Sequence, residues 1–487
     1  MKGKSTGRRI ISPRKIIKSN KTGNSPNSLI KKQLPLFQPK YKSRIIPKAE
    51  IDLNMNKTHM FSTHIRSSNE EIKIFSSQNF AEVSLKETRN LLIEKCKECS
   101  KICDFASDAK DIKAKSAKSA LLKQIASSFS NPHISKTLSN DVIKNFLYMI
   151  SKNIFRPFPN IKQESLPGFN DSMCDAAWPH ISLAYSCLNA YSCASSIKEF
   201  PPRFLSCLVD NTLSPDDRER KEAKTILTNI YNKFSSTRYV IRQKCSHIFI
   251  NQRCSLELLD FYYIVASSFA PPLKNETIDM FNHEILPLHN LDNYSTYYNY
   301  LIQVISRFVV KSESLLQSTF NYLIKHWPCA NRCKQSLFLK EYENLVVNFE
   351  NRMTKQMTMQ FFRKVNECIT NESADIANTA LEILQNPNLH FYVRDNASNL
   401  YFMLIFSISS VKSDHWNEDT RERASSALQI LNQTDPNTYK KVISVQKSIK
   451  SKPFCGISKN KWKKILDAAK AHDPCMSDLQ LDDLLSM

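Results

Sequence analysis

No glycine occurs between Gly168 and Gly456 in this chain of 487 residues. Glycine supplies the left-handed backbone conformations of tight hairpin turns and the close backbone approach of phosphate-binding loops. Without it, the chain is unsuited to a dinucleotide-binding fingerprint, a Walker loop or a β fold rich in hairpins. Helices joined by short turns that contain Pro, Asn and Ser are what remains, and they favour a binding scaffold over an enzyme.

Apolar residues recur at helical spacing from about residue 85 onward, and prolines interrupt the pattern every 15 to 50 residues. Such spacing is typical of helical hairpins stacked on one another. The sequence therefore predicts an all-α fold, an irregular HEAT-like (armadillo-type) helical-repeat solenoid. Four apolar faces that support this prediction are Val142, Phe146, Met149 and Ile150; Leu301, Val304, Ile305 and Phe308; Ile376, Ala380, Leu381 and Leu384; and Ala424, Ala427, Leu428 and Leu431.

The net charge of +22 is concentrated in the tails. Residues 1–50 hold 14 Lys and Arg against one acid, Glu50, and so carry +13 of the total. This composition cannot bury enough apolar surface to offset the entropy of ordering, so a disordered basic N-terminal tail is predicted for residues 1–85. The helical-repeat domain is placed at 86–445. Residues 446–487 are predicted to form a basic C-terminal segment with a terminal helix.

The chain is expected in the cytoplasm, the nucleus or both. No apolar secretory region opens the sequence, and its 14 cysteines lack the spacing of a disulfide framework. Residues 7–15 could direct nuclear import, while an organelle transit peptide is the alternative for an N-terminus so poor in acids. Ser12 and Ser25 each precede a proline among basic residues and are candidate phosphorylation sites. The apolar run 400–411 is shorter than the roughly 20 residues of a membrane span and predicts a buried helix.

Catalytic and metal-binding patterns are weak. Cys96, Cys99 and Cys103 lack a fourth ligand nearby, so we interpret them as ordinary helix cysteines. Pro287 separates His283 from His289, which rules out the spacing of a zinc-protease helix. No serine has the flanking glycines of a nucleophile elbow. We therefore expect no catalytic centre, no metal and no cofactor.

The stretch 216–242 combines charge and aromatic residues. Alternating charges follow Pro215, a position that favours the start of a helix. Ile226, Ile230 and Phe234 then belong to an apolar stripe, and Tyr231 and Arg238 to a basic, aromatic edge. Such an edge is either a solvated face or a binding surface.

Segments spread over residues 90–471 resemble the B-prime (B′, fifty-six-kDa class) regulatory subunits of protein phosphatase 2A. They occur in the family's order and with nearly its spacing. The segments are CDFASDAKDIKAK (103–115), NIFRPFP (153–159), AAWPH (176–180), the DRER and IYNKF region, SFAPPLK (268–274), EILPLHN (284–290), KHWPCANRCKQSLFLKEYENLV (325–346), RDN (394–396), DHWN (414–417) and KWKKILDAAKA (461–471).

The resemblance implies a non-catalytic regulatory subunit that binds the phosphatase scaffold (A) and catalytic (C) subunits. Hydrolysis of phosphoserine and phosphothreonine would belong to the two-metal centre of the catalytic subunit. The regulatory chain would recruit substrates or adaptors and so raise their effective concentration. In the family, a groove between middle repeats captures an extended Leu-x-x-Ile-x-Glu peptide.

The resemblance also assigns residues to this groove. Tyr231, Arg238 and Lys274 match groove residues, and Phe261 and Val265 stand where the family has isoleucines that line aliphatic pockets. The chain departs from the family at three positions on the acid-binding side. Thr228 and Asn229 replace a His-Arg pair, and Thr277 replaces a His. A charge-assisted hydrogen bond contributes about 1.5–3 kcal/mol, so loss of the arginine weakens acidic peptides roughly ten- to a hundredfold.

Two other binding roles compete with the regulatory one. A nucleic-acid-binding helical repeat would spread its basic residues along one face, whereas here the charge lies in the tails. A nuclear-transport adaptor would need a regular array of Trp and Asn, and the chain has only four Trp. The region from Tyr231 to Lys274 could alternatively contact the scaffold or serve packing. No membrane insertion is expected.

Overall fold

The computed structural model describes residues 59–65, 72–75, 78–129, 131, 134, 138–158, 173–194, 199–451, 463, 464, 466–468 and 470. The chain divides into two units, Met1–Lys57 and Thr58–Met487, and every described residue lies in the second. The predicted basic tail up to residue 58, the two Ser-Pro sites and most of the C-terminal segment lie outside the described residues.

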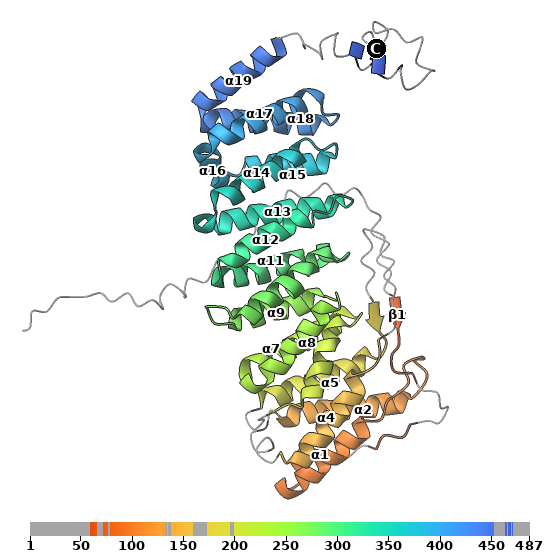
Figure 1. Ribbon diagram of the computed structural model, residues 1–487. Helices are drawn as coiled ribbons and strands as arrows, with labels where there is room; N and C mark the ends of the chain where they lie inside the picture. The colour runs from red at the N-terminus through yellow and green to blue at the C-terminus, as the bar shows by residue number, and fades with distance from the viewer. Residues whose placement is uncertain are drawn as a thin grey trace, which may run out of the picture. The chain divides into compact units, whose positions relative to one another are not determined.

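Helices in the described part of the chain stack in two rows that follow the order of the sequence (Figure 1). In the first row each helix packs against the next one: α2 (Ile112–Phe129), α5 (Trp178–Cys193), α7 (Asp217–Lys233), α9 (Leu256–Ser268), α11 (Tyr294–Lys311), α13 (Arg332–Asn348), α15 (Ala374–Leu384) and α18 (Glu418–Thr434). The second row contains α1 (Leu85–Cys99), α4 (Asn140–Ile154), α6 (Pro202–Asp210), α8 (Arg238–Ile250), α12 (Ser314–Lys325), α14 (Lys355–Ile369), α17 (Ala397–Asp414) and α19 (Pro436–Ser451).

Shorter elements complete the repeats. They include α10 (Asn275–Met280), the π-helical turn Phe281–Ile285, the 3₁₀ turn Leu286–Asn290 and α16 (His390–Asp395). Pro287 falls inside the 3₁₀ turn, where the missing N–H of proline prevents an α-helix from continuing. Pro202 and Pro436 are the first residues of α6 and α19, a position at which the fixed φ of proline suits a helix.

The four apolar faces predicted from the sequence are buried in the core, on α4, α11, α15 and α18. The all-α helical-repeat fold is therefore confirmed. The apolar run 400–411 lies within α17, but only one side of that helix is buried: Leu404 and Ile408 are fully enclosed, whereas Phe402 is exposed. In the described part of the chain, no helix is both long and apolar enough to cross a membrane.

A short parallel pair of strands lies beside the first repeats. Strand β1 (His59–Phe61) pairs with β2 (Met173–Asp175), with His59 opposite Met173. Both β1 and the 3₁₀ turn Phe80–Glu82 lie inside the range 1–85, which was assigned to the tail from the sequence. The chain is ordered here because His64 is buried and hydrogen-bonds the carbonyl of Asn153 on α4 (3.1 Å).

The three clustered cysteines lie on or just after α1, and all are buried. Burial raises the pKa of the Cys99 thiol to about 12. Within the described ranges, no group of three or more His, Cys, Asp or Glu side chains is arranged to hold a metal ion.

Candidate functional site

The carboxyl ends of four neighbouring first-row helices form an edge where basic side chains bind backbone carbonyls. Lys233 Nζ donates to the carbonyls of Ser192 (2.8 Å) and Ala194 (2.6 Å) at the end of α5. Arg352 donates to the carbonyl of Val309 (2.8 Å) near the end of α11. The last carbonyls of a helix lack partners within the helix and carry partial negative charge, so cations stabilise them. We call this the basic edge; its cations are Lys233, Arg238, Lys311 and Arg352.

Arg238 and Tyr231 meet where α7 ends and α8 begins. Arg238 Nε donates to the carbonyl of Tyr231 (2.9 Å), and its guanidinium lies 5.3 Å from the centroid of the Tyr231 ring. A terminal nitrogen of Arg238 donates to the carbonyl of Asn232 (3.3 Å). Arg238 is half-buried, and a guanidinium has five N–H donors. These contacts hold the side chain in place and leave donors for an anion.

Phe261 and Val265 are completely buried on α9. The Phe261 ring packs edge-on against Tyr231, with centroids 5.7 Å apart and ring planes at 87°. The Tyr231 hydroxyl is 2.8 Å from Ser268 Oγ and shares a hydrogen bond with it. A peptide side chain can therefore reach Phe261 or Val265 only if α7 and α9 move apart.

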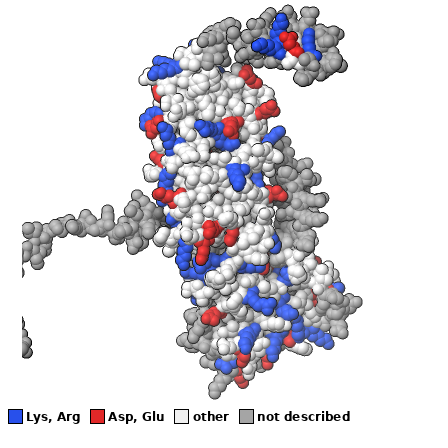
Figure 2. All heavy atoms as spheres, viewed as in Figure 1, with Lys and Arg blue, Asp and Glu red and all other residues white. Residues whose placement is uncertain are grey.

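The other predicted groove residues lie around this contact. Lys274 is exposed directly before α10, and its carbonyl accepts a hydrogen bond from the N–H of Thr277 (2.9 Å). Asn229 on α7 donates to Asn189 Oδ1 on α5 (3.0 Å), and Thr228 beside it is half-exposed. At the level of α7 and α9, Figure 2 shows a band of basic side chains with acidic side chains beside it. The structure thus places Arg238 and Phe261 each against Tyr231, while Lys274 and Thr277 lie at the start of α10.

Sequence reasoning missed Arg307 and Lys311 on α11. Arg307 donates to the hydroxyl of Tyr263 on α9 and lies 4.6 Å from the centroid of that ring. Lys311 Nζ donates to the carbonyls of Ala266 and Ser267 (3.1 Å for Ser267), at the end of α9. The signal was a basic pair four residues apart in a helix with no other charged residue, and this spacing places both on one face. That this face meets the end of α9 depends on the packing of two repeats.

A family model described as "Protein phosphatase 2A regulatory B subunit (B56 family)" matches residues 77–469. The chain belongs to the B56 family. It is accordingly a non-catalytic regulatory subunit of a Ser/Thr phosphatase of the 2A type. The absence of catalytic residues that was expected from the sequence agrees with this role.

Regulatory subunits from distant organisms are similar to this chain. The serine/threonine-protein phosphatase 2A regulatory subunit psrA of Dictyostelium discoideum is 28% identical over 434 residues, covering 84% of this chain and 67% of that protein. The human 56 kDa delta isoform is 27% identical over 409 residues, covering 79% and 67%. The 57 kDa B′ kappa isoform of rice (Oryza sativa subsp. japonica) is 26% identical over 411 residues, covering 80% of each. A designed armadillo repeat protein of known structure gives a TM-score of only 0.24 at 15% identity, over 46% of this chain and 99% of that chain.

Two of the B56-like segments, and the residue directly before a third, meet in a buried ion network. Arg156 follows α4 and donates to Glu219 on α7 (2.7 and 3.0 Å) and to Asp175 of β2 (2.8 Å). The side chain of Arg156 is 6% exposed and both carboxylates are fully buried. Tyr185 and Ser214 donate to the same Glu219 (3.1 and 2.6 Å). In this chain these segments therefore hold repeats together.

A second buried network joins two other B56-like segments. His289 donates from Nε2 to Glu341 on α13 (3.0 Å), and its Nδ1 is 2.7 Å from the carbonyl of Leu286. The Tyr294 hydroxyl also donates to Glu341 (2.9 Å). The Glu341 carboxylate thus accepts hydrogen bonds from an imidazole and a phenol in the interior of the array. Here too the matched residues have a structural role.

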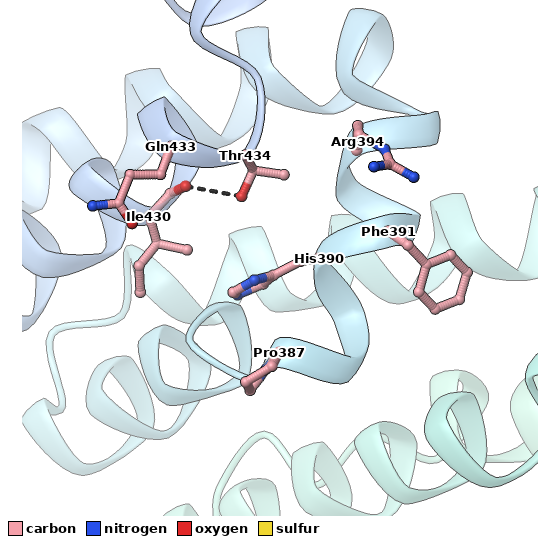
Figure 3. A pocket seen from close by; sticks show the side chains of 7 residues that line it. All are labelled: Pro387, His390, Phe391, Arg394, Ile430, Gln433 and Thr434. Carbon is pink, nitrogen blue, oxygen red and sulfur yellow. Dashed lines mark hydrogen bonds between the residues drawn. The ribbon is translucent and has the colours of Figure 1, made fainter.

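Two surface hollows lie in the last repeats, away from the predicted groove. One of about 420 Å³ lies between α16 and α18, and Figure 3 shows His390 pointing toward Ile430 while Phe391 turns the other way. The other, of about 810 Å³, includes the exposed Trp416, whose indole N–H donates to the carbonyl of Glu372 (2.8 Å). Neither is lined by a residue that the family resemblance assigned to peptide binding.

Proposed function

We propose that this regulatory subunit binds the scaffold and catalytic subunits of a 2A-type phosphatase and recruits acidic peptides at Arg238 and Lys274, between the end of α7 and the start of α10. Family membership supports the first part. The arrangement of Arg238 supports the second, because two backbone carbonyls and the Tyr231 ring hold it. The exposed Lys274 lies directly before α10, in the connection that follows the next first-row helix. Fixed cations lose little entropy when they bind an anion.

The apolar half of this peptide site contributes less than the charged half. Phe261 and Val265 have no exposed surface, so they offer no open pocket to an aliphatic side chain. Asn229 binds Asn189 of the neighbouring helix and adds no charge. Peptide affinity then depends mainly on Arg238 and Lys274, and it falls with rising salt because the contact is exposed.

Assembly with the phosphatase core is tested by mixing the full chain with purified scaffold and catalytic subunits. Size-exclusion chromatography should give a ternary complex of one copy of each subunit. Elution of the chain apart from the other two subunits, at micromolar concentrations, would contradict this part of the proposal.

The peptide site is tested with Arg238→Ala in the full chain. Fluorescence anisotropy with a labelled Leu-x-x-Ile-x-Glu peptide should show at least a tenfold loss of affinity, because a charge-assisted hydrogen bond contributes about 1.5–3 kcal/mol. Arg363→Ala, on the exposed side of α14, is the matched control and should bind like the unaltered chain. Equal affinity of the Arg238→Ala and Arg363→Ala variants would exclude Arg238 from the site.

For the location of the complex, the basic segment 7–15 favours the nucleus alongside the cytoplasm. A fluorescent fusion should lose its nuclear fraction when Arg8, Arg9, Arg14 and Lys15 are changed to Ala.

A further inference from the structure

We propose that Arg307 and Lys311, with Tyr263, form an anion subsite for a phosphoserine or phosphothreonine side chain of an extended peptide. The subsite lies at the ends of α9 and α11, beyond the groove residues that the family resemblance assigns. The inference also places an acidic residue of the same peptide at Arg238, and that part of it rests on the proposed function.

Arg307 is held in place but has unused donors. It donates to the Tyr263 hydroxyl and lies over that ring, with 4.6 Å between guanidinium and centroid. No other hydrogen bond of Arg307 is described, although a guanidinium has five N–H groups in a planar fork that matches a phosphate. The side chain is half-exposed, so these donors can reach a ligand.

Lys311 adds a second cation four residues along the same face of α11. Its ammonium donates to the carbonyls of Ala266 and Ser267, and an ammonium has three N–H donors in all. Burial and, to a smaller extent, the positive charge of Arg307 lower the pKa of Lys311 to about 8. The two cations are thus close enough to repel one another.

No carboxylate is paired with either cation among the described residues, in contrast to other cations of the same repeats. Arg220 binds Glu257 (2.7 Å), Lys224 binds Asp260 (2.7 Å) and Lys244 binds Asp210 (2.8 Å). Within the described part of the chain, the hydrogen bonds of Arg307 and Lys311 go to a hydroxyl and to backbone carbonyls, which are neutral. A phosphate group carries a charge of about −1.5 to −2 at neutral pH and would neutralise both cations at once.

The distance from Arg238 sets the length of the peptide. The guanidinium of Arg238 lies at the end of α7, whereas Lys311 donates to carbonyls at the end of α9 and Arg307 lies over the Tyr263 ring of α9, one first-row helix further on. Packed helices are about 8–10 Å apart. An extended chain advances about 3.3 Å per residue, so about three residues separate the acidic residue from the phosphate.

The experiment measures anisotropy of the full chain with synthetic peptides that carry a Glu-Glu pair and one phosphoserine three, six or nine residues away. Matched peptides carry Ser instead. Phosphorylation at a spacing of three should raise affinity about tenfold, and less at six or nine. Arg307→Gln and Lys311→Gln should each abolish most of this gain without changing binding of the Ser peptides. The charge-matched controls are Arg363→Gln on α14 and Lys340→Gln on α13, both at exposed positions. Each control should keep the gain in affinity from phosphorylation.

Any of three results would overturn the subsite. The first is equal affinity for phosphorylated and unphosphorylated peptides, and the second is a gain from phosphorylation that survives in both the Arg307→Gln and the Lys311→Gln variant. The third is binding of a twelve-nucleotide single-stranded RNA that depends on Arg307 and Lys311 to the same extent as binding of the phosphopeptide. Arg238→Ala separates this inference from the proposed function, since it should weaken every Glu-containing peptide and leave the relative gain from phosphate intact. If the gain in affinity from phosphorylation depends on Arg307 but Arg238→Ala does not change peptide affinity, the proposed peptide site at Arg238 is wrong and the subsite at Arg307 and Lys311 stands.

Discussion

At the scale of single residues, buried charges in this chain are compensated by groups from distant parts of the sequence. Arg156, Asp175 and Glu219 come from three segments, and each is nearly or fully enclosed. Burial alone would raise the pKa of Asp175, but hydrogen bonds from Thr63, the Ala177 N–H and Arg156 hold it below its ordinary 3.8. Removal of one partner leaves a buried charge without compensation, which is far costlier than the loss of an exposed ion pair.

Arg156→Met should therefore lower the free energy of unfolding by about 3–5 kcal/mol, because Glu219 and Asp175 remain buried without their counter-ion. Urea denaturation followed by circular dichroism measures the change. Arg203→Met, on the exposed side of α6, serves as the control and should shift stability by less than about 0.5 kcal/mol. A loss below about 1 kcal/mol for Arg156→Met would mean that the network contributes little.

Two histidines are buried in the uncharged form near the first repeats. Burial, followed by the positive charges of Arg156 and Lys118, lowers the pKa of His64 to about 3. Burial and Lys118 lower the pKa of His180 to about 4. Each ring donates one hydrogen bond from Nε2 to a backbone carbonyl. The acceptor for His64 is the carbonyl of Asn153 (3.1 Å), and the acceptor for His180 is the carbonyl of Lys115 (3.0 Å).

Stability should fall as the pH is lowered from 6.5 toward 4. In this window the unfolded chain binds a proton at each of the two histidines while the folded chain does not, so acid favours unfolding by up to about 1.4 kcal/mol per pH unit and histidine. His180→Gln keeps a donor for the Lys115 carbonyl but cannot be protonated, so it should flatten the pH dependence. Urea titrations at pH 7, 6, 5 and 4.5 test this, and an unchanged slope in His180→Gln would show that His180 is protonated equally in both states.

At the scale of elements, local sequence explains where helices start and which face they bury. The Asp216 side chain accepts a hydrogen bond from the N–H of Arg218 (3.0 Å) and caps α7, and the stripe that includes Ile226 and Ile230 is enclosed as its spacing predicts. Asn417 caps α18 in the same way, through the N–H of Thr420 (3.0 Å). Short-range hydrogen bonds and helical periodicity need no knowledge of the neighbouring repeats, so they can be read from the sequence.

The accessibility of the candidate groove could not be read in this way. Phe261 and Val265 were assigned to pocket walls by resemblance, and both are fully enclosed. Whether a side chain on α9 lines a pocket or fills one depends on the size of its neighbours on α7, and here the Tyr231 ring occupies that space. The assignment of these positions to peptide binding stays a prediction.

At the scale of the whole described array, stability is distributed over contacts between neighbouring repeats. First-row helices pack against the preceding and following members of that row, and α15 contacts α13, α14 and α18. A solenoid of this kind transmits a local defect mainly to adjacent repeats. Opening at one end therefore need not disturb a binding surface several repeats away.

Leu381→Ala tests this locality. Leu381 is fully buried on α15, and its truncation should cost about 2–5 kcal/mol. Hydrogen exchange should accelerate in α13, α14, α15 and α18, while α2 and α5 keep their protection. Equal acceleration along the entire array would show that it unfolds as one cooperative unit.

The sequence by itself determined the all-α repeat fold, the buried helix faces and the family, because lack of glycine, apolar periodicity and ordered motifs act locally or accumulate along the chain. Only the tertiary structure decided that Arg156 bridges two buried carboxylates, that the Tyr231 ring closes over Phe261, and that Arg307 and Lys311 meet the end of α9. These features depend on which helix ends become neighbours when repeats stack. That arrangement is set by the fit of many side chains at once, which no short stretch of sequence contains.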